Sequence, residues 1–191
     1  MNKRFFDGLA LILAIFPAVA LAHTGQGNHG FVDGFAHPFL GMDHLLAMVV
    51  VGMWSVLHTR KVWFAPTCFV IMLTIGAILG QNGFMVPKLE PLVAISVLIL
   101  GAMLTHPLKF GVSASLALIG GFAVFHGMAH GGELSAGASV LVGIIAGSVL
   151  LHVVGMSIAH TVLTNRPQLA RGFGNLVTVL GGWLILSNVL G

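Results

Sequence analysis

The chain has 191 residues, of which 57% are hydrophobic and only 7% are charged. A soluble domain has about 25% charged residues, so the composition excludes an ordinary soluble protein and predicts an integral membrane protein. The formal net charge of +3 is small and scattered, which argues against a nucleic-acid-binding protein. The single cysteine, Cys68, excludes an internal disulfide framework and a thiolate-rich metal cluster.

The first 22 residues have the features of a secretory signal peptide. Lys3 and Arg4 precede an apolar stretch, and a small-x-small triplet, residues 20–22, follows it. Cleavage there leaves His23 as the mature N-terminus. We predict a signal peptide, residues 1–22, followed by one transmembrane domain, residues 23–191. Cleavage after Ala20 is a competing alternative, and a retained segment would add a seventh helix.

Six apolar stretches follow, each with about the 20 residues that a bilayer crossing needs. They cover approximately residues 38–57, 62–80, 89–105, 109–130, 134–160 and 172–190. Glycines inside these stretches let helix backbones approach closely. The sequence therefore predicts an all-α, polytopic membrane helix bundle with six transmembrane helices after the cleaved signal peptide.

Basic residues indicate how the bundle is oriented, because Lys and Arg accumulate on the cytoplasmic side. An exported N-terminus leaves only Lys88 outside and places the other basic residues in the cytoplasmic connections: Arg60, Lys61, Lys109, Arg166 and Arg171. We predict that both mature termini lie outside, in the periplasm. The carboxylates of the mature chain then belong to the outer half and would concentrate cations there: Asp33, Asp43, Glu90 and Glu133.

The first predicted helix carries two histidines and an aspartate. A charged group near the bilayer centre costs about 2.5 to 3.5 kcal/mol on insertion scales, so Asp43 needs a partner or a cavity. Proline fits best in the first turn of a helix, so we expect the helix to begin at Pro38. On a straight helix His37 and His44 are roughly 10 Å apart. Either His37 lies above a deeper site formed by Asp43 and His44, or residues 38–41 are not helical and fold His37 back.

A second polar cluster, FHGMAHGGE, residues 125–133, lies at the outer end of the fourth predicted helix. His126 and His130 have the i, i+4 spacing with which two imidazoles on one helix turn bind the same metal. We expect Gly131 and Gly132 to end the helix, which lets Glu133 turn back toward the histidines. Two histidine–carboxylate clusters are thus predicted on the same side of the membrane.

A third pattern is weaker. His152, Met156 and His160 are spaced along one stripe of the fifth predicted helix, in its cytoplasmic half. They are candidates for successive binding positions of an ion that moves toward the cytoplasm, although a lone histidine in a bundle is more often a packing residue.

Imidazole and carboxylate without thiolate suit nickel, cobalt or zinc better than copper(I). After signal cleavage, His23 would add an α-amino group beside its imidazole, so we include it among the candidate metal ligands. Glu90, at the outer start of the third predicted helix, is a secondary candidate because carboxylates are so scarce in this chain. No G-x4-G-K-[ST] motif is present, and we expect no tightly bound cofactor.

The two motifs resemble signatures of the HupE/UreJ family of nickel permeases, which are associated with hydrogenase and urease maturation. His37-x5-Asp43-His44 is similar to the family's H-x5-D-H signature, and residues 125–133 are similar to F-H-G-x-[AV]-H-G-x-E. The helix count, the exported leader and the histidine that follows it also match, so the resemblance covers essentially the whole chain.

This resemblance implies inward transport of Ni²⁺ across the bacterial cytoplasmic membrane, in support of nickel-enzyme maturation proteins, and it does not exclude Co²⁺ as the ion. The metal-handling residues that it implies are His37, Asp43, His44, His126, His130 and Glu133. The expected partners are the divalent ion and the lipid bilayer, without nucleic acid. Two alternatives use the same clusters, an intramembrane metalloenzyme and an outward-facing metal sensor. We expect no enzyme, because the sequence has neither an H-E-x-x-H motif nor a nucleophile motif.

Overall fold

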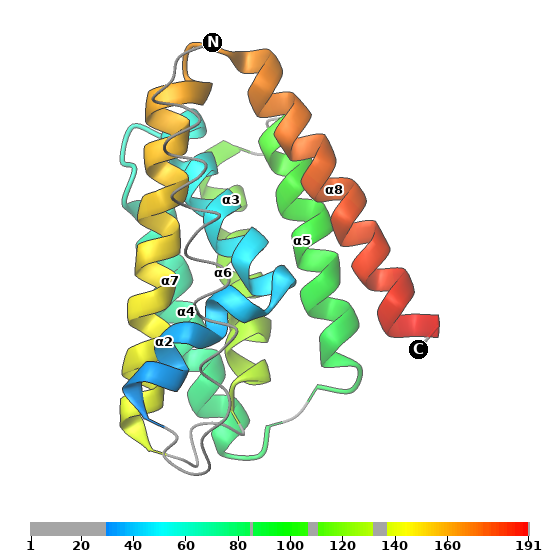
Figure 1. The fold of residues 1–191 in the computed structure, drawn as a ribbon. Coiled ribbons are helices and arrows are strands. Elements are labelled where there is room, and N and C mark those ends of the chain that lie inside the picture. Colours follow the sequence, from blue (N-terminus) through cyan, green and yellow to red (C-terminus); the bar gives the residue numbers. More distant parts are fainter. Residues whose placement is uncertain (1–29, 85, 107–110, 132–136, 191) are drawn as a thin grey trace.

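The computed structural model describes residues 30–84, 86–106, 111–131 and 137–190 (Figure 1). Within these ranges every regular element is a helix, which confirms the all-α prediction for this part of the chain. The helices are α2 (Phe31–Leu40), α3 (Met42–His58), α4 (Phe64–Gln81), α5 (Leu89–Thr105), α6 (Gly111–Ala129), α7 (Ala138–Ile158), the π-helix η2 (Ala159–Leu163) and α8 (Pro167–Leu190). The predicted signal peptide, residues 1–22, and His23 lie outside the described residues.

Four of the described helical segments are long and apolar enough to cross a membrane: α4, α6, α7 continued by η2, and α8. A fifth crossing is formed if α2 and α3 are taken together, although the two helices are bent by 84°. Helix α5 is apolar but has only 17 residues. The chain is therefore a multi-pass membrane protein, whereas the count of six spans remains a prediction.

The predicted start of the first span at Pro38 is wrong. Pro38 lies inside α2, and the helix that follows begins at Met42. Proline supplies a helical φ, and in α2 it removes one backbone hydrogen bond without ending the helix. The break comes instead at Gly41, whose ψ of 119° is extended. Residues 38–40 are thus helical, yet the chain still turns sharply just after them.

Helix α3 lies inside the bundle, and its buried residues form much of the core, among them Ala47, Met48, Val50, Val51 and Met53. Around it, α2 packs on α7, α4 packs on α6, and α5 packs on α8 (Figure 1). These pairs approach through glycine: a Cβ at Gly34 would clash with the Val140 carbonyl, and one at Gly127 would clash with the Leu73 carbonyl. The expected role of glycine in close helix packing is confirmed at these contacts.

The helices alternate in direction, so that α3, α5 and α7 with η2 end at the same end of the bundle (Figure 1). Arg60, Lys61 and Arg166 lie in the short connections at that end, and Arg171 follows in the first turns of α8. Lys88 and Glu90 lie at the opposite end, where α5 begins. The described basic residues are thus segregated as the sequence predicts.

Candidate metal site

Four histidines from three helices converge beside the break between α2 and α3. His37 comes from the last turn of α2, His44 from the first turns of α3, His126 from the last turn of α6, and His130 from just beyond that helix. The ring of His44 contacts the other three, with centroid distances of 6.0 Å to His37, 4.8 Å to His126 and 4.6 Å to His130. The rings of His37 and His130 are 4.5 Å apart. We call these four residues the histidine cluster.

The two predicted motifs therefore form one site. The turn at Gly41 folds His37 back toward His44, as one of the two alternatives requires, although the turn is at Gly41 alone and not across residues 38–41. His44, His126 and His130 are 6%, 0% and 1% exposed, so they lie inside the bundle and not on its lipid-facing surface. Irregular backbone at membrane depth is tolerated where protein surrounds it or where it lines a cavity.

Asp43 orients the central imidazole of the cluster. Its Oδ1 accepts a hydrogen bond from the backbone amide of His44, at 2.8 Å, and lies 2.7 Å from His44 Nδ1. A carboxylate acceptor favours a proton on Nδ1 and leaves the lone pair on Nε2, the arrangement typical of histidines that bind metal. His44 Nε2 is buried and has no hydrogen-bond partner among the described residues. This atom is therefore available to bind a metal ion.

Helix ends add to the local electrostatics. His126 and His130 lie at the C-terminal end of α6, and His37 lies in the last turn of α2. The C-terminal end of a helix carries a partial negative charge of about half an elementary charge, which favours a cation. Asp43 lies in the first turn of α3, where its carboxylate balances the opposite, positive end. The surroundings of the cluster thus favour a divalent cation.

Two further residues touch the cluster that the sequence interpretation did not include. Ser96 Oγ of α5 lies 2.8 Å from His126 Nε2, and the Phe69 ring of α4 lies 5.7 Å from the His126 ring. In the sequence, Ser96 is a hydroxyl-bearing residue within an apolar stretch. This is only weak evidence for a contact with another helix, because most such hydroxyls bond to a carbonyl of their own helix. Phe69 is indistinguishable from a core residue in the sequence.

Other candidates are not brought into the cluster by the described contacts. Glu133 and His23 lie outside the described residues, so their roles remain predictions. Glu90 is exposed in the first turn of α5, and the contacts of the cluster do not include it. Within the described ranges, no three His, Cys, Asp or Glu side chains are already arranged to hold a metal ion.

The third pattern is divided between two environments. His152 is 1% exposed, and its ring lies 5.2 Å from the ring of Phe69. His160, by contrast, is exposed on the π-helix η2. Phe69 therefore contacts two histidines, His126 and His152, whereas His160 does not continue the buried stripe.

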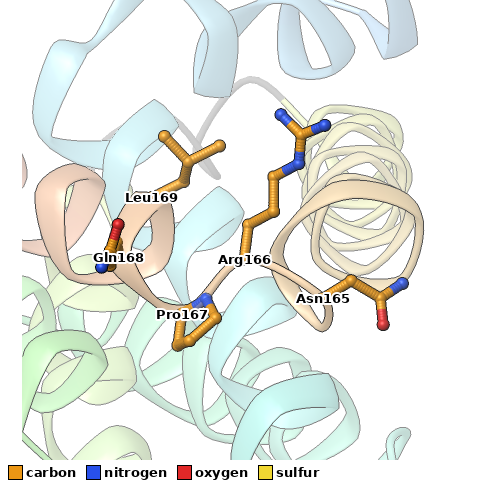
Figure 2. Close-up of a pocket in the computed structure, with 5 residues that line it drawn as sticks. All are labelled: Asn165, Arg166, Pro167, Gln168 and Leu169. Atoms are coloured by element: carbon orange, nitrogen blue, oxygen red, sulfur yellow. The ribbon is translucent and has the colours of Figure 1, made fainter.

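A surface pocket lies elsewhere, in the connection between η2 and α8 (Figure 2). Its lining residues are Asn165, Arg166, Pro167, Gln168 and Leu169. It contains none of the His, Cys, Asp or Glu side chains that bind borderline metals, and it lies at the end of the bundle away from the C-terminus of α6 (Figure 1). The histidine cluster is the better candidate site.

Comparisons with known proteins cover nearly the whole chain. Residues 11–184 match the family described as HupE / UreJ protein. The chain is 37% identical over 176 residues to Protein HupE of Rhizobium leguminosarum bv. viciae, covering 90% of this chain and 92% of that protein. No solved structure matches the chain. Proteins of this family are known as hydrogenase and urease accessory proteins of permease type, and they are not enzymes. The chain belongs to the HupE/UreJ family.

Proposed function

We propose that this protein carries Ni²⁺, or Co²⁺, inward across the bacterial cytoplasmic membrane and thereby supplies metalloenzyme maturation of the hydrogenase or urease type. The observation that carries the proposal is the convergence of four imidazoles and the Asp43 carboxylate inside a membrane-embedded bundle. A buried ionisable cluster of this kind is costly in a membrane and is a functional site by default.

The donor chemistry supports a borderline divalent ion. Imidazole nitrogen and carboxylate oxygen suit nickel, cobalt and zinc, whereas copper(I) prefers thiolate and thioether. Cys68 takes no part in the cluster, since its thiol donates a hydrogen bond to the Leu116 carbonyl at 3.7 Å. Ligand type does not separate nickel from cobalt, so the proposal includes both ions.

The charge distribution supports an inward direction. The described basic residues gather at one end of the bundle, which the positive-inside rule assigns to the cytoplasm. The C-terminal end of α6, with His126 and His130, lies toward the other end (Figure 1). The ion then reaches the cluster from outside, and the membrane potential favours its entry by about 2.3 kcal/mol per charge per 100 mV.

From the cluster, the inward route passes Phe69. Its ring contacts both His126 and His152, at centroid distances of 5.7 and 5.2 Å. Movement of this ring would bring an ion from the cluster to His152, a fully buried imidazole in α7. We therefore place His152 on the inward route, and we leave His160 out because it is exposed on the outside of the bundle.

Uptake of labelled nickel by proteoliposomes that contain the purified protein tests the proposal, with an inside-negative potential and a chelator inside. The variants Asp43→Ala and His130→Ala should abolish accumulation, while His160→Ala, a histidine outside the cluster, should retain it. Competition with cobalt and zinc then measures selectivity. If the intact protein accumulates no nickel, the proposal is wrong, and nickel binding without flux would point to a sensor.

A further inference from the structure

Ser96 is the polar neighbour of the cluster whose role the proposed function leaves open. It belongs to α5, and both Ser96 and His126 are 0% exposed. Its Oγ lies 2.6 Å from the Val93 carbonyl of its own helix and 2.8 Å from His126 Nε2 of α6. The same hydroxyl therefore serves two partners within hydrogen-bond distance.

Counting protons determines how the two hydrogen bonds are made. A serine hydroxyl has one hydrogen to donate, and a carbonyl oxygen can only accept. If the hydroxyl donates to the Val93 carbonyl, Oγ is left as the acceptor for a hydrogen on His126 Nε2. A neutral imidazole has one N–H, so Nδ1 of His126 then carries the lone pair.

The opposite tautomer is disfavoured on separate grounds. It would place the hydrogen on His126 Nδ1, which is buried and has no hydrogen-bond partner among the described residues. A buried N–H without an acceptor is more costly than an unpaired acceptor. The position of Ser96 and the surroundings of Nδ1 thus favour the same tautomer.

We propose that Ser96 is a positioning residue that holds His126 as the Nε2–H tautomer, so that His126 binds the transported ion through Nδ1. His44 is held as the opposite, Nδ1–H tautomer, because the Asp43 carboxylate lies beside its Nδ1 and leaves Nε2 to bind the ion. The site then binds the ion through different nitrogens on two facing helices. The inference about metal binding rests on the proposed function, whereas the tautomer itself does not.

The tautomer is measured by ¹⁵N nuclear magnetic resonance of metal-free, histidine-labelled protein in lipid nanodiscs at pH 8. The His126 signals are identified by their loss in His126→Gln. In the intact protein we expect a protonated Nε2 and an unprotonated Nδ1. A protonated Nδ1 in the intact protein would overturn the proposal.

Three variants test whether the Ser96 hydroxyl acts by orienting His126 or only by packing between helices. Ser96→Ala removes the hydroxyl, and Ser96→Thr retains it. Ser55→Ala is the matched control, because Ser55 is also 0% exposed and donates to a carbonyl three residues earlier, Gly52, at 2.7 Å. Thermal unfolding of each variant, followed by circular dichroism, shows whether it is folded.

We expect Ser96→Ala to give a mixture of His126 tautomers and to lower nickel uptake at subsaturating concentration by about 10-fold, the smaller of the usual effects of a ligand-orienting residue. Ser96→Thr and Ser55→Ala should behave as the intact protein does. An unchanged His126 spectrum in Ser96→Ala, or an equal loss of uptake in Ser55→Ala, contradicts the positioning role.

The two readouts distinguish failure of this inference from failure of the proposed function. The spectrum is recorded without metal and requires no transport. If the predicted tautomer is found and the intact protein accumulates no nickel, the tautomer assignment is supported and nickel transport is overturned. If nickel accumulates and the tautomer does not depend on Ser96, the positioning role is overturned and transport is supported.

Discussion

The rings of His37 and His130 lie edge to face, with centroids 4.5 Å apart, although α3, α4, α5 and α6 lie between the two residues in the sequence. His37 belongs to the short helix α2, and His130 follows α6. This contact joins a broken helical segment to the end of a long apolar helix. A metal ion held by both imidazoles would fix α2 against the rest of the bundle.

This relationship predicts energetic coupling between the two histidines. His37→Ala and His130→Ala should each weaken nickel binding by about 10-fold or more, since each removes one ligand. Because both would bind the same ion, the double variant should be less impaired than the product of the two single effects. Isothermal titration of detergent-solubilised protein measures the four affinities. Purely multiplicative effects would show that the two imidazoles act on separate ions.

Asp43→Asn removes the negative charge of the carboxylate but keeps the size of the side chain and its hydrogen-bond acceptor. The amide oxygen can still accept a hydrogen bond from His44 Nδ1, but it no longer offers a negative charge to a divalent ion. We expect nickel uptake to fall by about 10- to 100-fold, with the fold unchanged. Uptake at matched protein levels and helix content by circular dichroism test this. If Asp43→Asn takes up nickel as fast as the intact protein, the hydrogen bond to His44 is sufficient for uptake and the negative charge of Asp43 is not required.

Gly41→Ala tests the turn beside the cluster. The φ of Gly41 is −83°, which any residue adopts, so the backbone itself tolerates alanine. A Cβ there would lie 2.9 Å from Asp43 Oδ1 and 3.1 Å from His44 Nδ1, so it would displace the hydrogen-bonded Asp43–His44 pair. We expect a loss of nickel affinity of about 10-fold with little change in thermal stability.

The control for Gly41→Ala is Gly121→Ala in α6, where a Cβ would meet no atom within 4 Å. This control should bind nickel normally, and it should stabilise the helix slightly because alanine is the better helix former. Equal losses of affinity in the two variants would mean that the effect of Gly41→Ala does not arise from the crowded Asp43–His44 pair.

Gly34→Leu tests whether the docking of α2 positions His37. A Cβ at Gly34 would clash with the Val140 carbonyl of α7, and the neighbouring contact through Gly143 is equally close. A leucine should push α2 away from α7 and carry His37 with it. We expect loss of nickel uptake, together with faster proteolysis within residues 31–40, measured by limited digestion in nanodiscs. Unchanged uptake would show that His37 does not depend on this packing.

Uptake should also depend on pH. A metal binds the neutral imidazole, and a histidine of ordinary pKa, about 6.5, becomes protonated as the pH falls below that value. Lowering the external pH from 7.5 to 5 at constant membrane potential should therefore reduce the initial rate of nickel uptake about 10-fold, with recovery on return to pH 7.5. A flat profile over this range would contradict competition between protons and the metal ion for the histidine ligands.

Much of the fold follows from hydrophobic patterning. Apolar stretches predicted at residues 62–80, 89–105 and 109–130 correspond closely to α4, α5 and α6. Lipid requires every backbone polar group to be bonded within its own segment, so a long apolar stretch has little choice but to be a helix. The prediction was wrong at Pro38, because a proline can lie within a short helix and the sharper break is made by Gly41.

The sequence by itself determined the kind of protein, the placement of most helices and the two motifs with metal-binding chemistry, since composition and local spacing are properties of the chain. Only the tertiary structure decided which imidazoles meet. His37 reaches His130 because the chain bends by 84° at Gly41 and because α2 can approach α7 closely through Gly34. Likewise, Ser96 reaches His126 only because α5 and α6 pack together. Contacts between distant segments depend on the directions in which helices pack, and periodicity along one helix carries no information about those directions.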